Sequence, residues 1–151
     1  MIATIWFGIS KEPSGEVSQI AKAAQHELPP VVSSEVRDKI LKDFSQYFNA
    51  ADYDSLYDMF GPVAKAQVTK ETATKELKKL VNYFHSVESG VYTYSELVGS
   101  QGNTNIYMMY YTVKLSEKSE FGTKGTLKVT IAVQENEYQI YGILLNAESS
   151  A

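Results

Sequence analysis

Residues 106–115 read IYMMYYTVKL, and this stretch decides the fold class because large side chains occupy both its odd-numbered and its even-numbered positions. Successive side chains of a β-strand point to opposite faces of a sheet. One face would carry Tyr107, Met109, Tyr111, Val113 and Leu115, and the other Ile106, Met108, Tyr110, Thr112 and Lys114. A strand that is apolar on both faces must be covered on both or expose a patch. The stretch therefore fits a core strand, the wall of a ligand cleft or a sheet face that another subunit covers.

Three further stretches share this period of two, at residues 91–98, 126–133 and 138–145. In the stretch 126–133, apolar residues alternate with threonine and lysine, which indicates one buried face and one wet face. The connections are short and hold glycine or polar residues, and such links join antiparallel neighbours. The second half of the chain is therefore predicted to be an antiparallel meander.

The preceding residues show helical spacing instead. A stripe from Val36 to Phe48 follows Ser33-Ser34, which supply a hydroxyl cap. A short helix is expected at 52–60, with Asn49 and Asp52 at its start and Gly61-Pro62 at its end. A third helix runs from Thr69 to about residue 86, with Gly90 as its left-handed C-terminal residue. Three helices before a meander predict an α+β domain, with three N-terminal helices packed on an antiparallel sheet of four or more strands.

The chain of 151 residues suits one compact domain, which we place at residues 33–147. Residues 1–32 are interpreted as an N-terminal arm with a short helix that Pro29-Pro30 ends, and 148–151 as a tail. The apolar run at 2–9 is too short to span a bilayer and favours a strand-like or docked segment. A truncated anchor or an atypical signal is the alternative.

Composition narrows the function classes. The net charge of -4 gives no attraction to nucleic acid or to anionic membranes, and we expect neither partner and no membrane span. The chain has no cysteine, which excludes disulfides, thiolate nucleophiles and cysteine-based metal sites. A cysteine-free domain tolerates either redox environment, so a cytoplasmic and an extracytoplasmic location both stay open.

The order of elements, with FSQYFNAADYDSLYDMF (44–60), the helix at 71–86 and YQIYGILLN (138–146), resembles the nuclear transport factor 2-like (cystatin-like) superfamily. The corner FNAADYDSLYDMF is similar to that of small bacterial members of unknown function. The resemblance covers about residues 33–147 and implies a sheet curled around a long helix into a cone with a pocket. It leaves function open, because this scaffold hosts isomerases, dehydratases, cyclases and non-catalytic modules.

Enzymatic relatives direct a carboxylate base with tyrosine donors, or histidines with an aspartate, into the cone. Of the two histidines, His26 lies in the arm and His85 at the border of the third helical stripe, so a histidine pair in one cone is not expected. Glu96 is the one carboxylate well inside a strand pattern, on the face of Tyr92 and Tyr94. An enzyme of isomerase or dehydratase type would use Glu96 or His85 with tyrosine donors, but a solvated Glu96 is the more frequent arrangement.

A metal site at Asp52, Asp54 and Asp58 is disfavoured, because Asp52 has a capping role and the other two should face solvent. No motif for a phosphate loop, a serine nucleophile or a zinc site is present, and no cofactor is expected.

The 11 tyrosines suggest two surfaces. Candidates for a mostly apolar pocket, suited to a small apolar or aromatic ligand, are Tyr47, Tyr53, Tyr57, Tyr107, Met109 and Tyr111. Candidates for a homodimer face on the sheet are Ile106, Met108, Tyr110, Tyr141 and Ile143. The leading hypothesis is a non-catalytic binding or assembly module that dimerises through its sheet.

Overall fold

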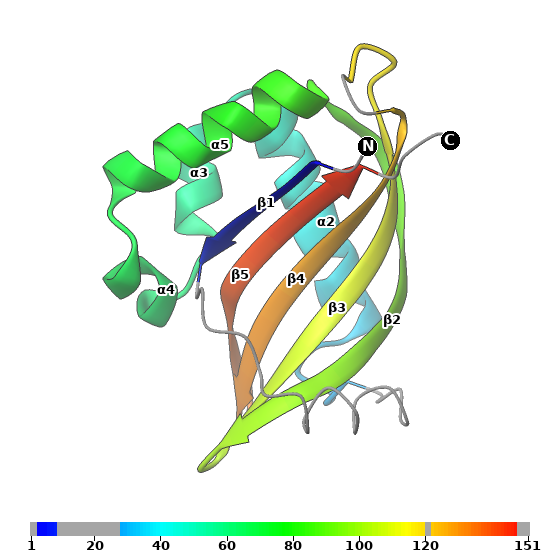
Figure 1. The fold of residues 1–151 in the computed structure, drawn as a ribbon. Helices are drawn as coiled ribbons and strands as arrows, with labels where there is room; N and C mark the ends of the chain where they lie inside the picture. Colours follow the sequence, from blue (N-terminus) through cyan, green and yellow to red (C-terminus); the bar gives the residue numbers. More distant parts are fainter. Residues whose placement is uncertain (1–2, 9–27, 120–121, 148–151) are drawn as a thin grey trace.

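The computed structural model describes residues 3–8, 28–119 and 122–147. Helices fill the first half and antiparallel strands the second (Figure 1). The helices are α2 (Ser34–Asn49), α3 (Tyr53–Asp58), α4 (Pro62–Gln67) and α5 (Lys70–Phe84). The strands are β1 (Ala3–Gly8), β2 (Val87–Gln101), β3 (Thr104–Leu115), β4 (Lys124–Gln134) and β5 (Glu137–Ala147). This confirms an α+β fold. The predicted arm helix and the tail lie outside the described residues. Within the described ranges, no helix combines the length and apolar character needed to cross a membrane.

Side-chain caps begin three of the helices, and two of them, Ser33 and Thr69, were expected. Ser33 accepts a hydrogen bond from the Val36 amide at α2, and Thr69 accepts one from the Thr72 amide at α5. At α3 the N-cap is Asp52, whose carboxylate accepts from the Ser55 amide. Asn49 was predicted to cap this helix, but it is instead the last residue of α2.

The side chain of Asn49 connects α2 to the sheet. Its amide donates to the Val87 carbonyl oxygen at 2.9 Å, and its carbonyl oxygen accepts from the Val87 amide at 2.8 Å. Val87 is the first residue of β2 and is only 1% exposed. This pair of hydrogen bonds fixes the position of the start of β2 relative to the end of α2.

Helix α4 was not predicted, because Gly61-Pro62 was interpreted only as the end of α3. Pro62 instead occupies the first turn of a new helix, where its missing amide hydrogen costs nothing. Gly61 is required at this junction, since a β-carbon there would lie 2.4 Å from the β-carbon of Gln139.

The end of α5 also differs from the prediction. The helix ends at Phe84, and His85 follows with a φ of 65°. Gly90 therefore does not end a helix; it lies within β2. A β-carbon at Gly90 would meet Val113 at 2.9 Å and Leu41 at 3.1 Å, so the glycine lets α2 approach the sheet.

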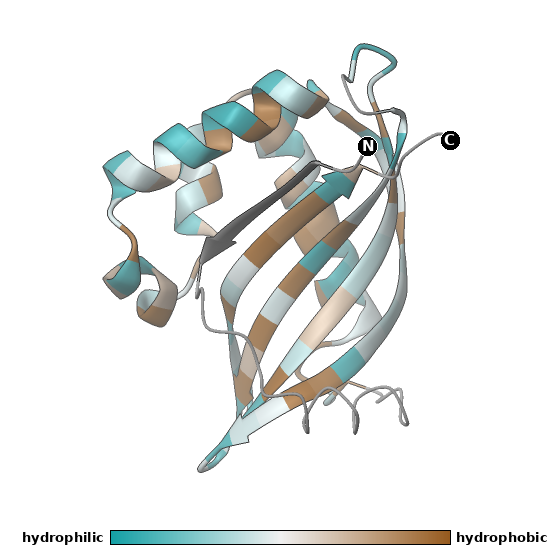
Figure 2. Ribbon diagram, viewed as in Figure 1, coloured by the Kyte–Doolittle hydropathy of each residue, from teal (hydrophilic) through white to brown (hydrophobic). Residues whose placement is uncertain are grey.

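The five strands form one antiparallel sheet in the order β1-β5-β4-β3-β2. The apolar run near the N-terminus supplies β1, which pairs with β5 from Ala3 opposite Ala147 to Gly8 opposite Gly142. Bands of hydrophobic and polar residues alternate along β4 (Figure 2). This strand has the predicted buried face, but Thr130 on its other side is also buried.

Bulges interrupt the alternation on two strands. In β2 the register against β3 shifts at Glu88, Thr93 and Val98, and in β5 the register against β4 shifts at Tyr141. An extra residue in one strand moves the following side chains to the other face. Faces predicted by strict alternation therefore change at these points.

The helices cover one face of the sheet (Figure 1). Their buried side chains join the inward residues of the strands in a single hydrophobic cluster. Phe44 and Phe48 of α2 stack with ring centroids 5.3 Å apart, and Tyr111 of β3 is fully buried with them. The space between helix and sheet is thus filled by aromatic side chains.

Candidate functional site

The outer face of the sheet is the side away from the helices, and strand pairing brings its residues into rows. One row runs Tyr94, Tyr110, Lys128 and Leu144 across strands β2 to β5. The next row holds Glu96, Met108, Thr130 and Gly142. Half-buried aromatic, apolar and charged groups thus lie together on a face that no described helix covers.

Four of these residues form what we call the tyrosine cluster: Tyr94, Glu96, Tyr110 and Lys128. The rings of Tyr94 and Tyr110 stack with centroids 4.4 Å apart and planes at 8°. The Tyr110 hydroxyl donates to the Glu96 carboxylate at 3.2 Å. The Lys128 ammonium lies 5.5 Å from the centre of the Tyr110 ring, within range of a cation–π attraction.

The electrostatics of the cluster keep both phenols neutral. Burial raises the pKa of the Tyr110 hydroxyl above its ordinary value, and the negative charge of Glu96 raises that pKa further. Burial, followed by the charge of Glu96, also raises the pKa of Tyr94. The cluster therefore presents neutral hydroxyl groups beside one carboxylate and one ammonium group.

Apolar side chains border the cluster. Ile106, Met108 and Leu144 are half-buried, and Val91 is 61% exposed opposite Thr112. The outer face thus contains three of the five residues predicted for a dimer face, Ile106, Met108 and Tyr110.

The other two dimer candidates are placed differently. Ile143 lies in the core, 3% exposed, because it pairs with the inward Val129. Tyr141 is the unpaired residue of the β5 bulge and is half-buried. The bulge is the reason that simple alternation assigned Ile143 to the outer face.

The six residues predicted for a pocket belong to the core or its margin. Tyr107, Met109 and Tyr111 are buried, while Tyr47, Tyr53 and Tyr57 are partly buried against the same cluster. The Tyr111 hydroxyl donates to the Arg37 carbonyl oxygen at 2.9 Å, and the Tyr57 hydroxyl to the Val68 carbonyl oxygen at 2.9 Å. These two hydroxyl groups therefore donate hydrogen bonds to backbone carbonyl oxygens of the same chain.

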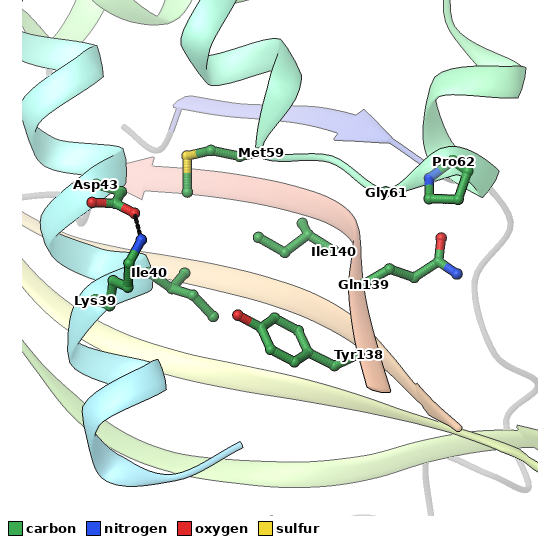
Figure 3. Close-up of a pocket in the computed structure, with 9 residues that line it drawn as sticks. All are labelled: Lys39, Ile40, Asp43, Met59, Gly61, Pro62, Tyr138, Gln139 and Ile140. Atoms are coloured by element: carbon green, nitrogen blue, oxygen red, sulfur yellow. Dashed lines mark hydrogen bonds and ion pairs between the residues drawn. The ribbon is translucent and has the colours of Figure 1, made fainter. Parts of the chain in front are cut away.

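A groove of about 330 Å³ opens elsewhere, between α2, the α3–α4 junction and the start of β5 (Figure 3). The Lys39–Asp43 ion pair, at 2.6 Å, stands on one wall. The lining residues are Lys39, Ile40, Asp43, Met59, Gly61, Pro62, Tyr138, Gln139 and Ile140. None of the six predicted pocket residues lines it. Its volume is at the lower end of the range for small-molecule sites.

The two candidates for acid–base chemistry lie apart. His85 is exposed at the C-terminal end of α5, outside the groove. Glu96 was predicted to share a face with Tyr92 and Tyr94, but its phenolic donor is Tyr110, on the outer face. The bulge at Thr93 separates Tyr94 and Glu96 from the inward Tyr92. His26 lies outside the described residues.

The three aspartates considered for a metal serve other contacts. Asp52 caps α3, Asp54 pairs with Lys70 at 3.1 Å, and Asp58 pairs with Lys65 at 3.4 Å. Among the described residues, no three His, Asp or Glu side chains are grouped so that they could hold a metal ion.

Sequence reasoning missed Lys128, Leu144 and Val91 as parts of the site. Lys128 was interpreted only as a solvent-facing residue of a clean strand. Its relation to Tyr110 and Leu144 follows from the pairing of β3, β4 and β5, and only the alternation of Lys128 with Leu127 and Val129 indicated its face.

The comparisons with known proteins add no assignment to this geometry. No protein-family model matches the chain, and the curated proteins include no match to its sequence.

Proposed function

We propose that the protein is a non-catalytic binding or assembly module of nuclear transport factor 2-like type, and that it forms a homodimer through the outer face of its sheet. The observation that carries this proposal is the tyrosine cluster. Helices that precede an antiparallel meander and cover one of its faces are compatible with the resemblance seen in the sequence.

The tyrosine cluster has the properties of an interaction surface. Tyrosine is enriched at protein interfaces because it offers a large contact area with few rotatable bonds and one polar group. Stacking between Tyr94 and Tyr110 and the hydrogen bond to Glu96 hold the rings in place before any partner arrives. Less conformational entropy is then lost on association.

The filled interior also favours surface binding. Phe44, Phe48 and Tyr111 are each no more than 1% exposed and pack in the hydrophobic core between α2 and the sheet. By contrast, Val91 is exposed, and Met108 and Leu144 are half-buried. A second surface that removes these apolar side chains from water would therefore bind favourably.

A matched pair of variants tests the proposal. Val91 and Tyr138 are the exposed large hydrophobic residues of the described chain, the first on the outer face and the second at the groove. Val91→Lys buries a charge in the proposed interface and should weaken the dimer by about tenfold or more. Tyr138→Lys should leave the dimer unchanged.

Light scattering across a dilution series of the wild-type protein and both variants measures this difference, with circular dichroism to check folding. The proposal fails if the wild-type protein is monomeric, if Val91→Lys associates as the wild-type protein does, or if only Tyr138→Lys weakens association.

A further inference from the structure

We infer that a second copy of this chain docks on the outer face in one specified arrangement, in which Glu96 of each protomer pairs with Lys128 of the other. This inference rests on the proposed function and adds the contact that selects the partner and fixes the geometry. It follows from the position of two opposite charges on either side of Tyr110.

Glu96 and Lys128 stand on the strands that flank β3 on its two sides. Neighbouring strands are about 4.8 Å apart, so the two residues are separated by about 10 Å across the sheet and by one row along it. Tyr110 lies between them, with its hydroxyl on the Glu96 carboxylate and its ring beside the Lys128 ammonium. Each charge therefore has a fixed position relative to the same aromatic ring.

This arrangement is complementary to itself. A two-fold axis that lies between two facing sheets, above β3 and at right angles to the line from Glu96 to Lys128, exchanges the positions of the two residues. Each carboxylate then faces an ammonium group of the other copy, and the two contacts form at once. Tyr110 lies near the axis, so the aromatic rings of the two copies meet at the centre, as expected for an isologous interface.

The two charges are available for such contacts. Within the described ranges the ion pairs join other residues, namely Lys39 with Asp43, Lys65 with Asp58, Lys70 with Asp54 and Lys79 with Glu76. Glu96 and Lys128 are both half-buried. Charges that are already partly removed from water lose less hydration when they pair across an interface.

The surrounding apolar groups make the paired arrangement selective. A copy rotated so that Glu96 met Glu96 would bury like charges beside Met108 and the tyrosine rings, at a cost in affinity. The charges thus make one dimer arrangement more stable than the others, while the burial of aromatic and apolar area supplies most of the affinity.

Charge reversal on separate chains provides the test. Glu96→Lys and Lys128→Glu should each weaken homodimerisation by about tenfold or more, because each places two like-charge contacts in the interface. An equimolar mixture of the two variants should form a heterodimer with an affinity within about threefold of wild type, since both contacts are then between opposite charges. Sedimentation velocity, with one variant fluorescently labelled, distinguishes the heterodimer from either homodimer.

The outcomes separate this inference from the proposed function. Heterodimer formation from two monomeric variants supports the pairing. A wild-type dimer with no rescue in the mixture, or with single variants that dimerise normally, overturns the pairing and leaves the dimer itself standing. A wild-type protein that stays monomeric overturns both.

Because Glu96→Lys also removes the acceptor of the Tyr110 hydroxyl, a second measurement leaves Glu96 unchanged. The dissociation constant of the wild-type dimer should rise severalfold between low and high salt, and Lys128→Gln should lose most of this dependence. A salt dependence that is the same in wild type and Lys128→Gln contradicts the pairing.

Discussion

Replacement of Asn49 by alanine should destabilise the protein through the connection between α2 and β2. The substitution removes both hydrogen bonds to Val87, at 2.9 and 2.8 Å. Each such bond contributes about 1 kcal/mol net, and Val87 is buried, so its backbone groups cannot turn to water instead. Alanine regains about 0.5 kcal/mol through its better helix propensity. The expected loss is therefore about 1.5 kcal/mol in the free energy of unfolding.

For a domain of this size, that loss corresponds to a decrease in Tm of about 3–6 °C. Urea unfolding followed by circular dichroism measures the free energy, and an unchanged m-value would show that the unfolded state is unaffected. Gln46→Ala, an exposed amide on the same helix, is the matched control and should change stability by less than about 0.5 kcal/mol. Equal stability of the two variants would refute the role given to Asn49.

Three further substitutions test other parts of the structure. Thr130→Val should stabilise the protein by about 1 kcal/mol in urea unfolding, because the buried Thr130 hydroxyl has no hydrogen-bond partner among the described residues; a loss of stability would contradict this. Gly61→Ala should cost about 2 kcal/mol or more, since the added β-carbon would lie 2.4 Å from the β-carbon of Gln139, and a neutral result would show that the α3–α4 junction yields easily. Burial raises the pKa of Tyr111, so the folded state keeps a proton that the unfolded state loses near the ordinary pKa of about 10. Stability should therefore fall as pH rises above about 10, less steeply in Tyr111→Phe than in wild type, and equal slopes in urea unfolding across this pH range would argue against it.

Local patterns in the sequence predicted much of the fold. The helical stripes placed α2, α3 and α5, and the period of two placed the strands β2 to β5. Such patterns arise because each element must turn one apolar side toward a shared core. The Ser33 and Thr69 caps were also predictable, since a cap acts within one turn of its helix.

The features that sequence reasoning missed depend on contacts between distant segments. Gly61 is needed because of Gln139, and Gly90 because of Leu41 and Val113. A glycine in the sequence does not reveal whether it permits a positive φ or a close approach. The glycines were therefore interpreted as helix ends when they serve packing.

The candidate site was predicted only in part for the same reason. Ile106, Met108 and Tyr110 follow from the alternation within β3, which has no bulge. The contact between Tyr110 and Glu96 required the bulge at Thr93, and Ile143 was misplaced by the bulge at Tyr141. Bulges are set by pairing with the neighbouring strand, so one strand considered alone does not predict them.

The mass of the wild-type protein in solution tests the central proposal most directly. Sedimentation equilibrium at micromolar concentration should give twice the chain mass of 16.8 kDa, with dissociation on dilution. A mass of 16.8 kDa at every concentration would contradict the account of the outer face as a dimer interface.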